Sequence, residues 1–324
     1  MKAMVATRWC EPAELEYRDV PDPRPGPGEA LVEVRAIGCN FPDLLMVQGK
    51  YQVKPPLPFS PGHEVGGVVR EVGPGVTRVR PGQRVLAMLR WGGYAEAVIA
   101  PVAHAYPIPE RMSFEEAAAF GLVYQTAYCA LVHRAALQPG EWLLVHGAAG
   151  GVGLAAVQVG RALGARVIAT ASTAEKLEIA RQAGAEVLID YRTGEWVDRV
   201  KQATGGAGAD VIYDPVGGEV FDLSSKCIAF EGRLLSIGFA GGQIPSIAVN
   251  RVLIKNFSVV GVHWGLYQQR GSPLVDRWME ALFALYEKGQ VRPVVWRTFP
   301  LREAAGALAA IAGRESYGKV VLIP

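Results

Sequence analysis

The sequence predicts an α/β protein of two parts, a small β barrel and a doubly wound parallel sheet. Short strand patterns separated by proline and glycine turns fill residues 1 to about 120, which is typical of a barrel. Strand and helix patterns then alternate from about residue 125 to 265, as expected of a parallel sheet with crossover helices. Within this second part, a glycine-rich turn joins an apolar strand to an apolar helix over Glu141–Gly164.

The first part contains four strand patterns and one helix pattern. The strands are predicted over Ala30–Ile37, Val65–Val72, Gln83–Met88 and Gly93–Ile99. Ser113 and Glu116 have the spacing of a capping box, so a helix is predicted to start there and to run through Phe120.

In the second part, strand patterns alternate with helix patterns. The predicted strands are Trp142–Val145, Arg166–Thr170, Glu186–Ile189, Ala209–Tyr213, Arg233–Ile237 and Phe257–Val262. The predicted helices are the one that ends at Gly164, followed by Ala174–Ala183, Glu195–Thr204 and Leu274–Glu287. The tail, Val291–Pro324, contains two short strand patterns around a helix near Arg302–Ala312.

The turn after Trp142–Val145 has the features of a dinucleotide-binding fingerprint. Its glycines are Gly147, Gly150, Gly151 and Gly153, in a G-x-x-G-x-x-G spacing with one extra glycine. Glycine lets the backbone approach a pyrophosphate closely, and a helix N-terminus offers free N–H groups. The alternative is a tight strand-to-helix turn without a ligand. We therefore predict a dinucleotide-binding domain over residues 125–265 and a first domain over residues 1–124 that is completed by residues 266–324.

The composition is that of an ordinary globular protein. Half of the 324 residues are hydrophobic, a fifth are charged, and the formal net charge is +2. The sequence has no dense Lys/Arg run, no apolar leader and no long apolar run, so we expect no nucleic-acid partner and no membrane span. The four cysteines are scattered without a C-x-x-C pair, which favours a reducing, cytoplasmic location.

Five stretches, read in order, resemble one enzyme superfamily: Gly38–Asp43, Pro61–Glu64, Gly67–Val76, Pro81–Val85 and Ala148–Gly153. Together they resemble the medium-chain dehydrogenases/reductases, and in particular the zinc-independent quinone oxidoreductase branch that includes zeta-crystallin. The resemblance covers the whole chain. It implies a GroES-like barrel, a Rossmann domain, NADPH as the cofactor, and homodimers or homotetramers built partly through the sheet edge near residues 256–262.

Zinc-dependent members of this superfamily bind a catalytic metal through Cys or Asp, His and Cys. Asn40 stands at the first of these positions, and an uncharged amide is a poor zinc ligand. His63 and Glu64 keep the middle of the pattern, but no cysteine stands at the third position and no four-cysteine lobe occurs. We therefore expect no metal, and we interpret His63 as a hydrogen-bonded structural residue.

The resemblance assigns cofactor contacts to loops that follow strands of the second domain. The residues under the pyrophosphate would be Ala149, Gly150, Gly151 and Val152. The residues near the nicotinamide would be Thr126, Gly238, Phe239, Ala240, Val262, His263 and Trp264.

Two of these residues, and Asp214 in a further loop, have alternative interpretations. Thr126 matches a threonine near the nicotinamide, but a helical threonine also bonds to its own backbone. His263 is a candidate proton donor, with loop packing as the alternative. Asp214 follows a strand at the ligand-binding edge and either contacts a ligand or caps the next helix.

The residues after the second strand of the sheet predict NADPH rather than NADH. NAD-specific sites usually place an acidic residue at the end of this strand, but here Thr170 is followed by Ala171-Ser172-Thr173. Ser172 can donate a hydrogen bond to a 2′-phosphate, and Lys176 can supply positive charge. Glu175 is interpreted as stabilising the helix start. By resemblance, Tyr191 flanks the same phosphate.

Asn40 and Tyr51 are the candidate catalytic residues, because they match polar positions that face the nicotinamide in quinone oxidoreductases. Tyr51 can donate a hydrogen bond to a carbonyl oxygen as negative charge develops there. The alternative for Tyr51 is a surface position in a proline-rich loop. Leu45 stands where a second tyrosine is often found, which alters the pocket.

These residues support three hypotheses about function. The first is an NADPH-dependent, metal-free reductase of quinones, and the second is a reductase of activated alkenes such as enones or acryloyl thioesters. The third is an NADPH-binding structural or RNA-binding protein, which the small net charge disfavours. In both enzyme hypotheses a hydride passes to a small conjugated acceptor.

Overall fold

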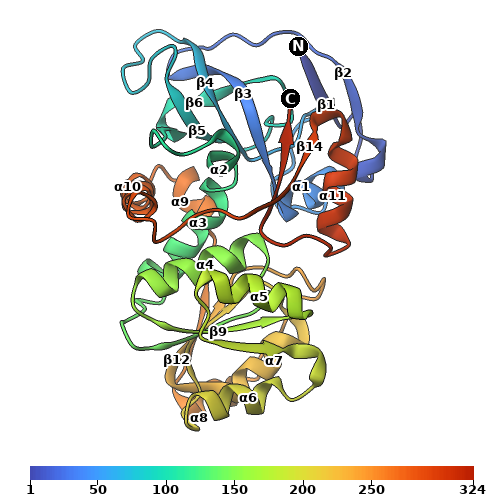
Figure 1. The fold of residues 1–324 in the computed structure, drawn as a ribbon. Helices are drawn as coiled ribbons and strands as arrows, with labels where there is room; N and C mark the ends of the chain where they lie inside the picture. The colour runs from blue at the N-terminus through green and yellow to red at the C-terminus, as the bar shows by residue number, and fades with distance from the viewer. The chain divides into compact units, whose positions relative to one another are not determined.

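The structure is a computed structural model that describes residues 1–324, and it divides into two compact units (Figure 1). Unit 1 comprises Met1–Leu122 and Pro293–Pro324, and unit 2 comprises Val123–Arg292. The first boundary lies two residues before the predicted one at residue 124. The C-terminal return to unit 1 begins at Pro293 rather than at residue 266, because residues 266–292 belong to unit 2.

Two helices explain this difference, α9 (Trp264–Gln269) and α10 (Leu274–Glu287). The buried amide of Gln125 joins both of them to unit 2. Its Nε2 donates to the Val275 carbonyl at 3.0 Å, and its Oε1 accepts from the Trp264 indole N–H at 3.2 Å. The sequence pattern gives the bounds of α10 correctly but contains no signal for the unit against which it packs.

Unit 1 is built on a seven-stranded sheet in the order β14-β15-β3-β4-β5-β7, with β6 also paired to β3. The strands are β3 (Glu29–Cys39), β4 (Glu64–Val72), β5 (Arg84–Met88), β6 (Ala97–Pro101), β7 (Ala105–Pro107), β14 (Val295–Pro300) and β15 (Lys319–Ile323). A separate pair is formed by β1 (Lys2–Val5) and β2 (Glu16–Asp19). Three strands match their predictions closely, whereas the one expected at Gly93–Ile99 lies later, in β6. The shift arises because the Gly93 and Tyr94 N–H groups pair with the loop carbonyls of Gly62 and Pro61.

The long strand β3 brings the C-terminus of the chain to the site. One edge of β3 pairs with β4, and the other is shared between β6 and β15. In the antiparallel register with β15, Val320 lies opposite Cys39. Lys319 therefore lies beside Asn40, the residue that follows β3.

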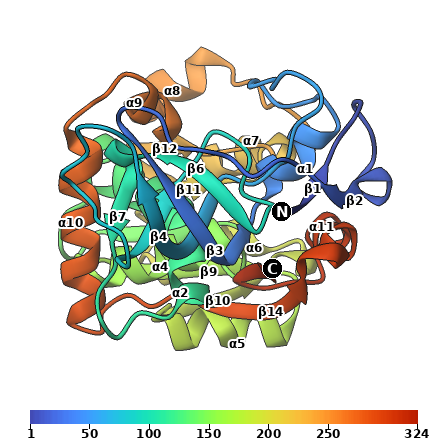
Figure 2. The ribbon, with the colours of Figure 1, turned by 90° about the horizontal axis from the view of Figure 1, so that it is seen from above.

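Unit 1 also contains three short helices, α1 (Phe41–Val47), α2 (Phe114–Ala118) and α11 (Ala304–Ala312). The predicted capping box starts α2: the Glu116 N–H donates to Ser113 Oγ at 3.1 Å, and the Ser113 N–H donates to Glu116 Oε2 at 3.0 Å. Figures 1 and 2 both show α11 close to α1 and to the N-terminal segment.

Unit 2 contains a six-stranded parallel sheet in the order β10-β9-β8-β11-β12-β13. Its strands are β8 (Trp142–Val145), β9 (Arg166–Ala171), β10 (Val187–Asp190), β11 (Ala209–Asp214), β12 (Ile228–Ser236) and β13 (Ser258–Gly261). This is the predicted doubly wound sheet, and the order reverses between β8 and β11. Figure 1 shows α4 (Gly151–Ala162) and α5 (Ala174–Ala183) on one face of this sheet, and α6 (Trp196–Ala203), α7 (Gly218–Cys227) and α8 (Val249–Lys255) on the other.

One more helix precedes this sheet in sequence. It is α3 (Gly121–Tyr128), which continues as a π-helix over Cys129–Arg134. No helix of the structure is both long and apolar enough to cross a bilayer.

Candidate active site

The glycine turn in unit 2 leaves the start of α4 open to an anion. Gly147 has a φ of +56°, and Gly150 caps α4 without any side chain over the helix end. A Cβ at Gly153 would lie 2.3 Å from the Gly147 carbonyl oxygen, so only glycine allows the helix to begin so close to the turn. Free N–H groups and the positive end of the helix dipole favour negative charge here. The residues proposed for the pyrophosphate lie in this turn: Ala149, Gly150, Gly151 and Val152.

A second loop meets this turn at the point where the strand order reverses. A Cβ at Gly147 would be 3.8 Å from Pro215 and from Val216, which follow β11. Asp214 Oδ1 accepts the N–H groups of Val216 at 2.7 Å and Gly217 at 3.1 Å. Asp214 therefore organises its own loop, while its second oxygen is buried without a partner. Burial raises the pKa of this carboxyl group.

The residues proposed for the 2′-phosphate come together at the ends of two neighbouring strands. Asp190 lies opposite Ala171 in the register of β10 with β9, so Tyr191 and Ser172 follow at adjacent strand ends. Thr173, not Ser172, caps α5, because its side chain accepts the Lys176 N–H at 3.2 Å. Lys176 consequently lies in the first turn of α5, on the same edge of the sheet.

The two loops assigned to the nicotinamide leave the last strands of the same sheet. The Ala240 N–H donates to the Pro215 carbonyl at 3.0 Å, which fixes the loop that contains Gly238 and Phe239. The Val262 N–H donates to the Ser236 carbonyl at 3.0 Å.

Three further cofactor candidates lie on or next to α3 and α9. Trp264 is buried, and its indole N–H is bound by Gln125, so this side chain anchors α9. Thr126 is the next residue on α3 and is partly buried. His263 is the N-cap residue of α9, where its side chain makes no capping hydrogen bond and is exposed.

In unit 1, Asn40 lies in a buried charged cluster with Glu64 and Lys319. The Lys319 ammonium donates to Asn40 Oδ1 at 2.5 Å, to Glu64 Oε1 at 2.8 Å and to the Cys39 carbonyl at 2.9 Å. Asn40 Nδ2 donates to Glu64 Oε1 at 3.0 Å and to the Gly38 carbonyl at 3.2 Å. Glycine at position 38 makes room for this cluster, since a Cβ there would lie 2.8 Å from Glu64.

The cluster continues through Asp43 to the second catalytic candidate. Asp43 Oδ1 lies 2.5 Å from His63 Nδ1, and Asp43 Oδ2 accepts the Tyr94 hydroxyl at 3.2 Å. The Tyr51 ring meets the edge of the His63 ring at 5.9 Å between centroids. His63 is thus hydrogen-bonded, and Tyr51 is partly buried rather than a surface side chain. Burial, followed by the Asp43 charge, raises the pKa of the Tyr51 phenol.

Sequence reasoning did not identify Lys319 as part of this site. Its partner Glu64 is 255 positions away in the chain, and no local pattern joins them. The available signal is a lone lysine at the head of the apolar strand β15, where a charge in an otherwise buried run needs a partner.

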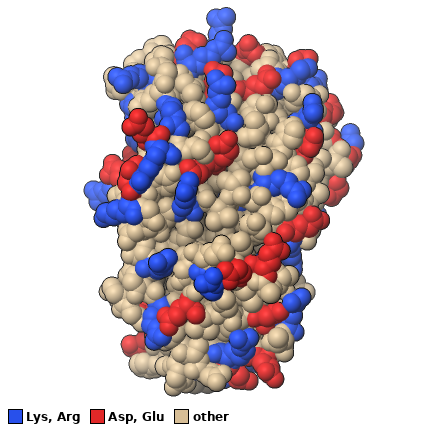
Figure 3. Space-filling view, viewed as in Figure 1, with Lys and Arg blue, Asp and Glu red and all other residues tan.

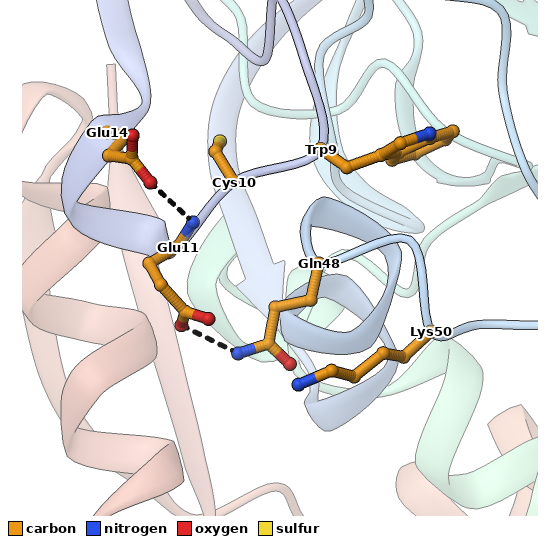
Figure 4. Close-up of a pocket in the computed structure, with 6 residues that line it drawn as sticks. All are labelled: Trp9, Cys10, Glu11, Glu14, Gln48 and Lys50. Atoms are coloured by element: carbon orange, nitrogen blue, oxygen red, sulfur yellow. Dashed lines mark hydrogen bonds between the residues drawn. The ribbon is translucent and has the colours of Figure 1, made fainter.

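The surface of unit 1 has a separate shallow hollow of about 220 Å³ between Trp9 and Lys50. Figure 4 shows its polar rim, where Gln48 Nε2 donates to Glu11 at 2.7 Å and the Glu11 N–H donates to Glu14 at 3.0 Å. These groups pair with one another, and the hollow contains none of the predicted site residues.

Both halves of the chain match models of known domains. Residues 26–110 match the alcohol dehydrogenase GroES-like domain, and residues 151–280 match the zinc-binding dehydrogenase family. Quinone oxidoreductase-like protein 2 of Bos taurus is 40% identical over 302 residues, which are 93% of this chain and 86% of that protein. The chain belongs to the medium-chain dehydrogenase/reductase superfamily, in its quinone oxidoreductase-like branch.

Solved structures of medium-chain reductases agree with this assignment. The quinone oxidoreductase of Thermus thermophilus, solved alone and with NADPH, is 39% identical with a TM-score of 0.88, over 100% of both chains. That of Escherichia coli, solved with NADPH, is 32% identical with a TM-score of 0.92, also over 100% of both chains. The predicted fold class is confirmed, and the protein is an oxidoreductase.

The zinc named in one of these family models does not fit the residues of unit 1. The Lys319 ammonium already lies against Asn40 and Glu64, and its positive charge opposes a metal ion there. Burial raises the pKa of the Cys39 thiol to about 12, which disfavours the thiolate form that binds a metal. No group of three or more His, Cys, Asp and Glu side chains is arranged to hold a metal.

Proposed function

We propose that this medium-chain reductase uses NADPH to reduce a small conjugated acceptor, with a quinone as the first candidate. The observation that carries the proposal is the pair of anion sites on one edge of the unit 2 sheet. These are the open start of α4 and the adjacent strand ends that carry Ser172, Lys176 and Tyr191. NADPH contains a pyrophosphate and a 2′-phosphate, which match these two sites.

The proposed binding of NADPH uses residues of unit 2. Ala149, Gly150, Gly151 and Val152 would hold the pyrophosphate. Ser172 and Lys176, beside Tyr191, would hold the 2′-phosphate. The nicotinamide candidates remain Thr126, Gly238, Phe239, Ala240, Val262, His263 and Trp264, although the Trp264 indole N–H is already used within the protein.

The reduced nicotinamide supplies a hydride when it is bound. The residues of unit 1 do not fit a metal ion that would polarise the substrate. An acceptor that is already electron-poor therefore suits this site better than an ordinary alcohol or ketone. The Tyr51 hydroxyl makes no hydrogen bond within the chain and is the candidate donor to the acceptor oxygen. Solvent can deliver the final proton, so the proposal requires no dedicated general acid.

The test is steady-state oxidation of NADPH with a panel of quinones and enones, together with NADPH labelled with deuterium at C4. We expect turnover with at least one acceptor class and, with an enone, transfer of the label to the β-carbon of the product. Product that forms without the label would rule out direct hydride transfer. Turnover with enones alone would favour the activated-alkene hypothesis, because no residue of the site separates the two acceptors.

The hypothesis of an RNA-binding or purely structural role has less support. Basic and acidic side chains are interspersed on the face drawn in Figure 3, without a stripe of one sign. A protein that tracks a phosphate backbone usually presents such a stripe. Binding of NADPH without turnover of any acceptor would favour this hypothesis over the first.

We also propose a homodimer through the free edge of the unit 2 sheet. Strand β13 pairs with β12 alone, so its other edge is open. Nearby aliphatic side chains are strongly exposed: Ile244 by 79%, Val249 by 76%, Leu253 by 75% and Ile254 by 73%. An open strand edge can pair with another chain, and an exposed aliphatic patch marks an interaction site.

A further inference from the structure

A buried ion pair fixes the surroundings of Asn40. The side chains of Lys319 and Glu64 are 4% and 0% exposed and lie 2.8 Å apart. The three protons of the ammonium meet three acceptors, on Cys39, Asn40 and Glu64. The second carboxylate oxygen of Glu64 accepts the Leu122 N–H at 2.8 Å. The ammonium therefore has no unused donor, and three of the four lone pairs of the carboxylate are used.

The pair leaves the Asn40 amide one orientation. An ammonium can only donate and a carboxylate can only accept, so Oδ1 must face Lys319 and Nδ2 must face Glu64. The second Nδ2 proton goes to the Gly38 carbonyl. A flipped amide would set its N–H groups against the ammonium and its oxygen against the carboxylate.

We propose that the Lys319–Glu64 pair is a positioning device that makes Asn40 a hydrogen-bond acceptor only. Both Nδ2 protons are consumed, so the remaining capacity of the amide is one lone pair on Oδ1. A ligand at Asn40 must then bring a donor, such as the carboxamide N–H or a ribose hydroxyl of a nicotinamide nucleotide. The oxygen of a quinone brings none. The inference about the ligand rests on the proposed function, whereas the inference about the amide does not.

The variants must separate positioning from folding. Lys319→Met alone leaves the Glu64 carboxylate buried and unpaired, which is strongly destabilising. The double variant Lys319→Met/Glu64→Leu removes both charges and keeps similar volumes, and such replacements are often neutral for stability. Lys2→Met is the matched control, because Lys2 pairs with Asp19 at 2.8 Å at the exposed surface of the same unit.

The first measurement needs neither cofactor nor substrate. The chain has three asparagines, Asn40, Asn250 and Asn256, so selective ¹⁵N labelling of asparagine gives three pairs of side-chain amide signals. The Asn40 pair is identified by its loss in Asn40→Ala. We expect slow hydrogen exchange of this pair in the wild type and in Lys2→Met, and fast exchange in the double variant. Slow exchange that survives in the folded double variant would overturn the proposal.

The second measurement is kinetic. In the double variant, kcat should fall about tenfold, the scale of one lost hydrogen bond, while the Kd for NADPH changes less than about threefold because the phosphate sites lie in unit 2. When Asn40→Ala is already present, the same double change should lower kcat little further, since the pair acts through Asn40. Full additivity of the two losses, or unchanged kcat in a folded double variant, would contradict the inference. A wild type without any turnover would instead contradict the proposed function and leave the exchange measurement decisive for the amide.

Discussion

Tyr51 is the residue whose unused hydrogen-bond capacity has the clearest chemical consequence. Its hydroxyl is not paired within the chain, and burial raises its pKa, so it remains a neutral donor at physiological pH. Tyr51→Phe should lower turnover by about tenfold or less, because a neutral hydrogen bond contributes about 0.5–1.5 kcal/mol. Steady-state kinetics with NADPH titration check this. Complete loss of turnover with intact NADPH binding would make Tyr51 an essential acid.

Lys176 carries the second prediction about a single residue. Lys176→Ala should weaken NADPH binding by about 1–3 kcal/mol, the scale of a hydrogen bond to a charged group, and should leave NADH binding nearly unchanged. Lys201→Ala is the control, because Lys201 is an exposed lysine of α6 that pairs with Asp198. Calorimetric titration of both cofactors measures the difference. Equal losses for NADPH and NADH would refute the assignment of the 2′-phosphate site.

His146 predicts a pH dependence of stability. Its Nε2 lies 2.9 Å from Ser224 Oγ, whose own proton goes to the Val220 carbonyl, so Nε2 carries the proton and Nδ1 accepts from Thr170. Burial lowers the pKa of this imidazole from 6.5 to about 3. The unfolded chain therefore binds a proton that the folded chain does not, and stability falls as the pH drops from about 6.5 towards 3. In urea titrations across this range, His146→Gln should remove part of that fall, while His133→Gln, at an exposed position, should not. If the free energy of unfolding falls equally with pH in His146→Gln and in the wild type, protonation of His146 is not the cause.

At the scale of elements, two glycines inside helices should respond in opposite ways to alanine. A Cβ at Gly160 of α4 would lie 2.4 Å from Leu143 Cδ2 of β8, whereas a Cβ at Gly306 of α11 would meet nothing within 4 Å. Gly306→Ala should stabilise the protein by up to about 1 kcal/mol through helix propensity. Gly160→Ala should destabilise it by about 1–3 kcal/mol through overpacking between helix and sheet. Thermal unfolding of the two variants gives the comparison, and stabilisation of both would show that propensity alone decides.

The helices and strands also show how much of the structure could be predicted from sequence patterns. Runs with one clear period gave β8, α5 and α10 with the bounds that the structure has. Helix α1 was missed because its seven residues are too few to show a clear period, and α7 was missed because paired glycines stand at its start. In the site, the glycine turn is a short motif that can be identified from the sequence alone. Lys319 cannot be identified in this way, because its role depends on strand pairing across most of the chain.

At the scale of the whole molecule, the proposed homodimer yields a prediction about assembly. Leu253 and Ile254 are exposed apolar residues of α8, the helix that precedes β13 in the chain. The variant Leu253→Glu/Ile254→Glu should convert a dimer into a monomer, because buried like charges oppose association. Light scattering after size-exclusion chromatography measures the mass. Leu57→Glu, at an exposed position in unit 1, should leave the mass unchanged. A wild-type monomer at micromolar concentration would refute the dimer.

The path of the chain through unit 1 also has a consequence for its biosynthesis. A ribosome that adds 5–20 residues per second releases Lys319 roughly 13–50 s after Glu64, because 255 positions separate them. Until then the carboxylate of Glu64 has no cation to balance its burial. Unit 2, by contrast, is one uninterrupted segment that emerges completely before the last strands of unit 1. The half of the protein that is synthesised first is therefore expected to reach its native state last.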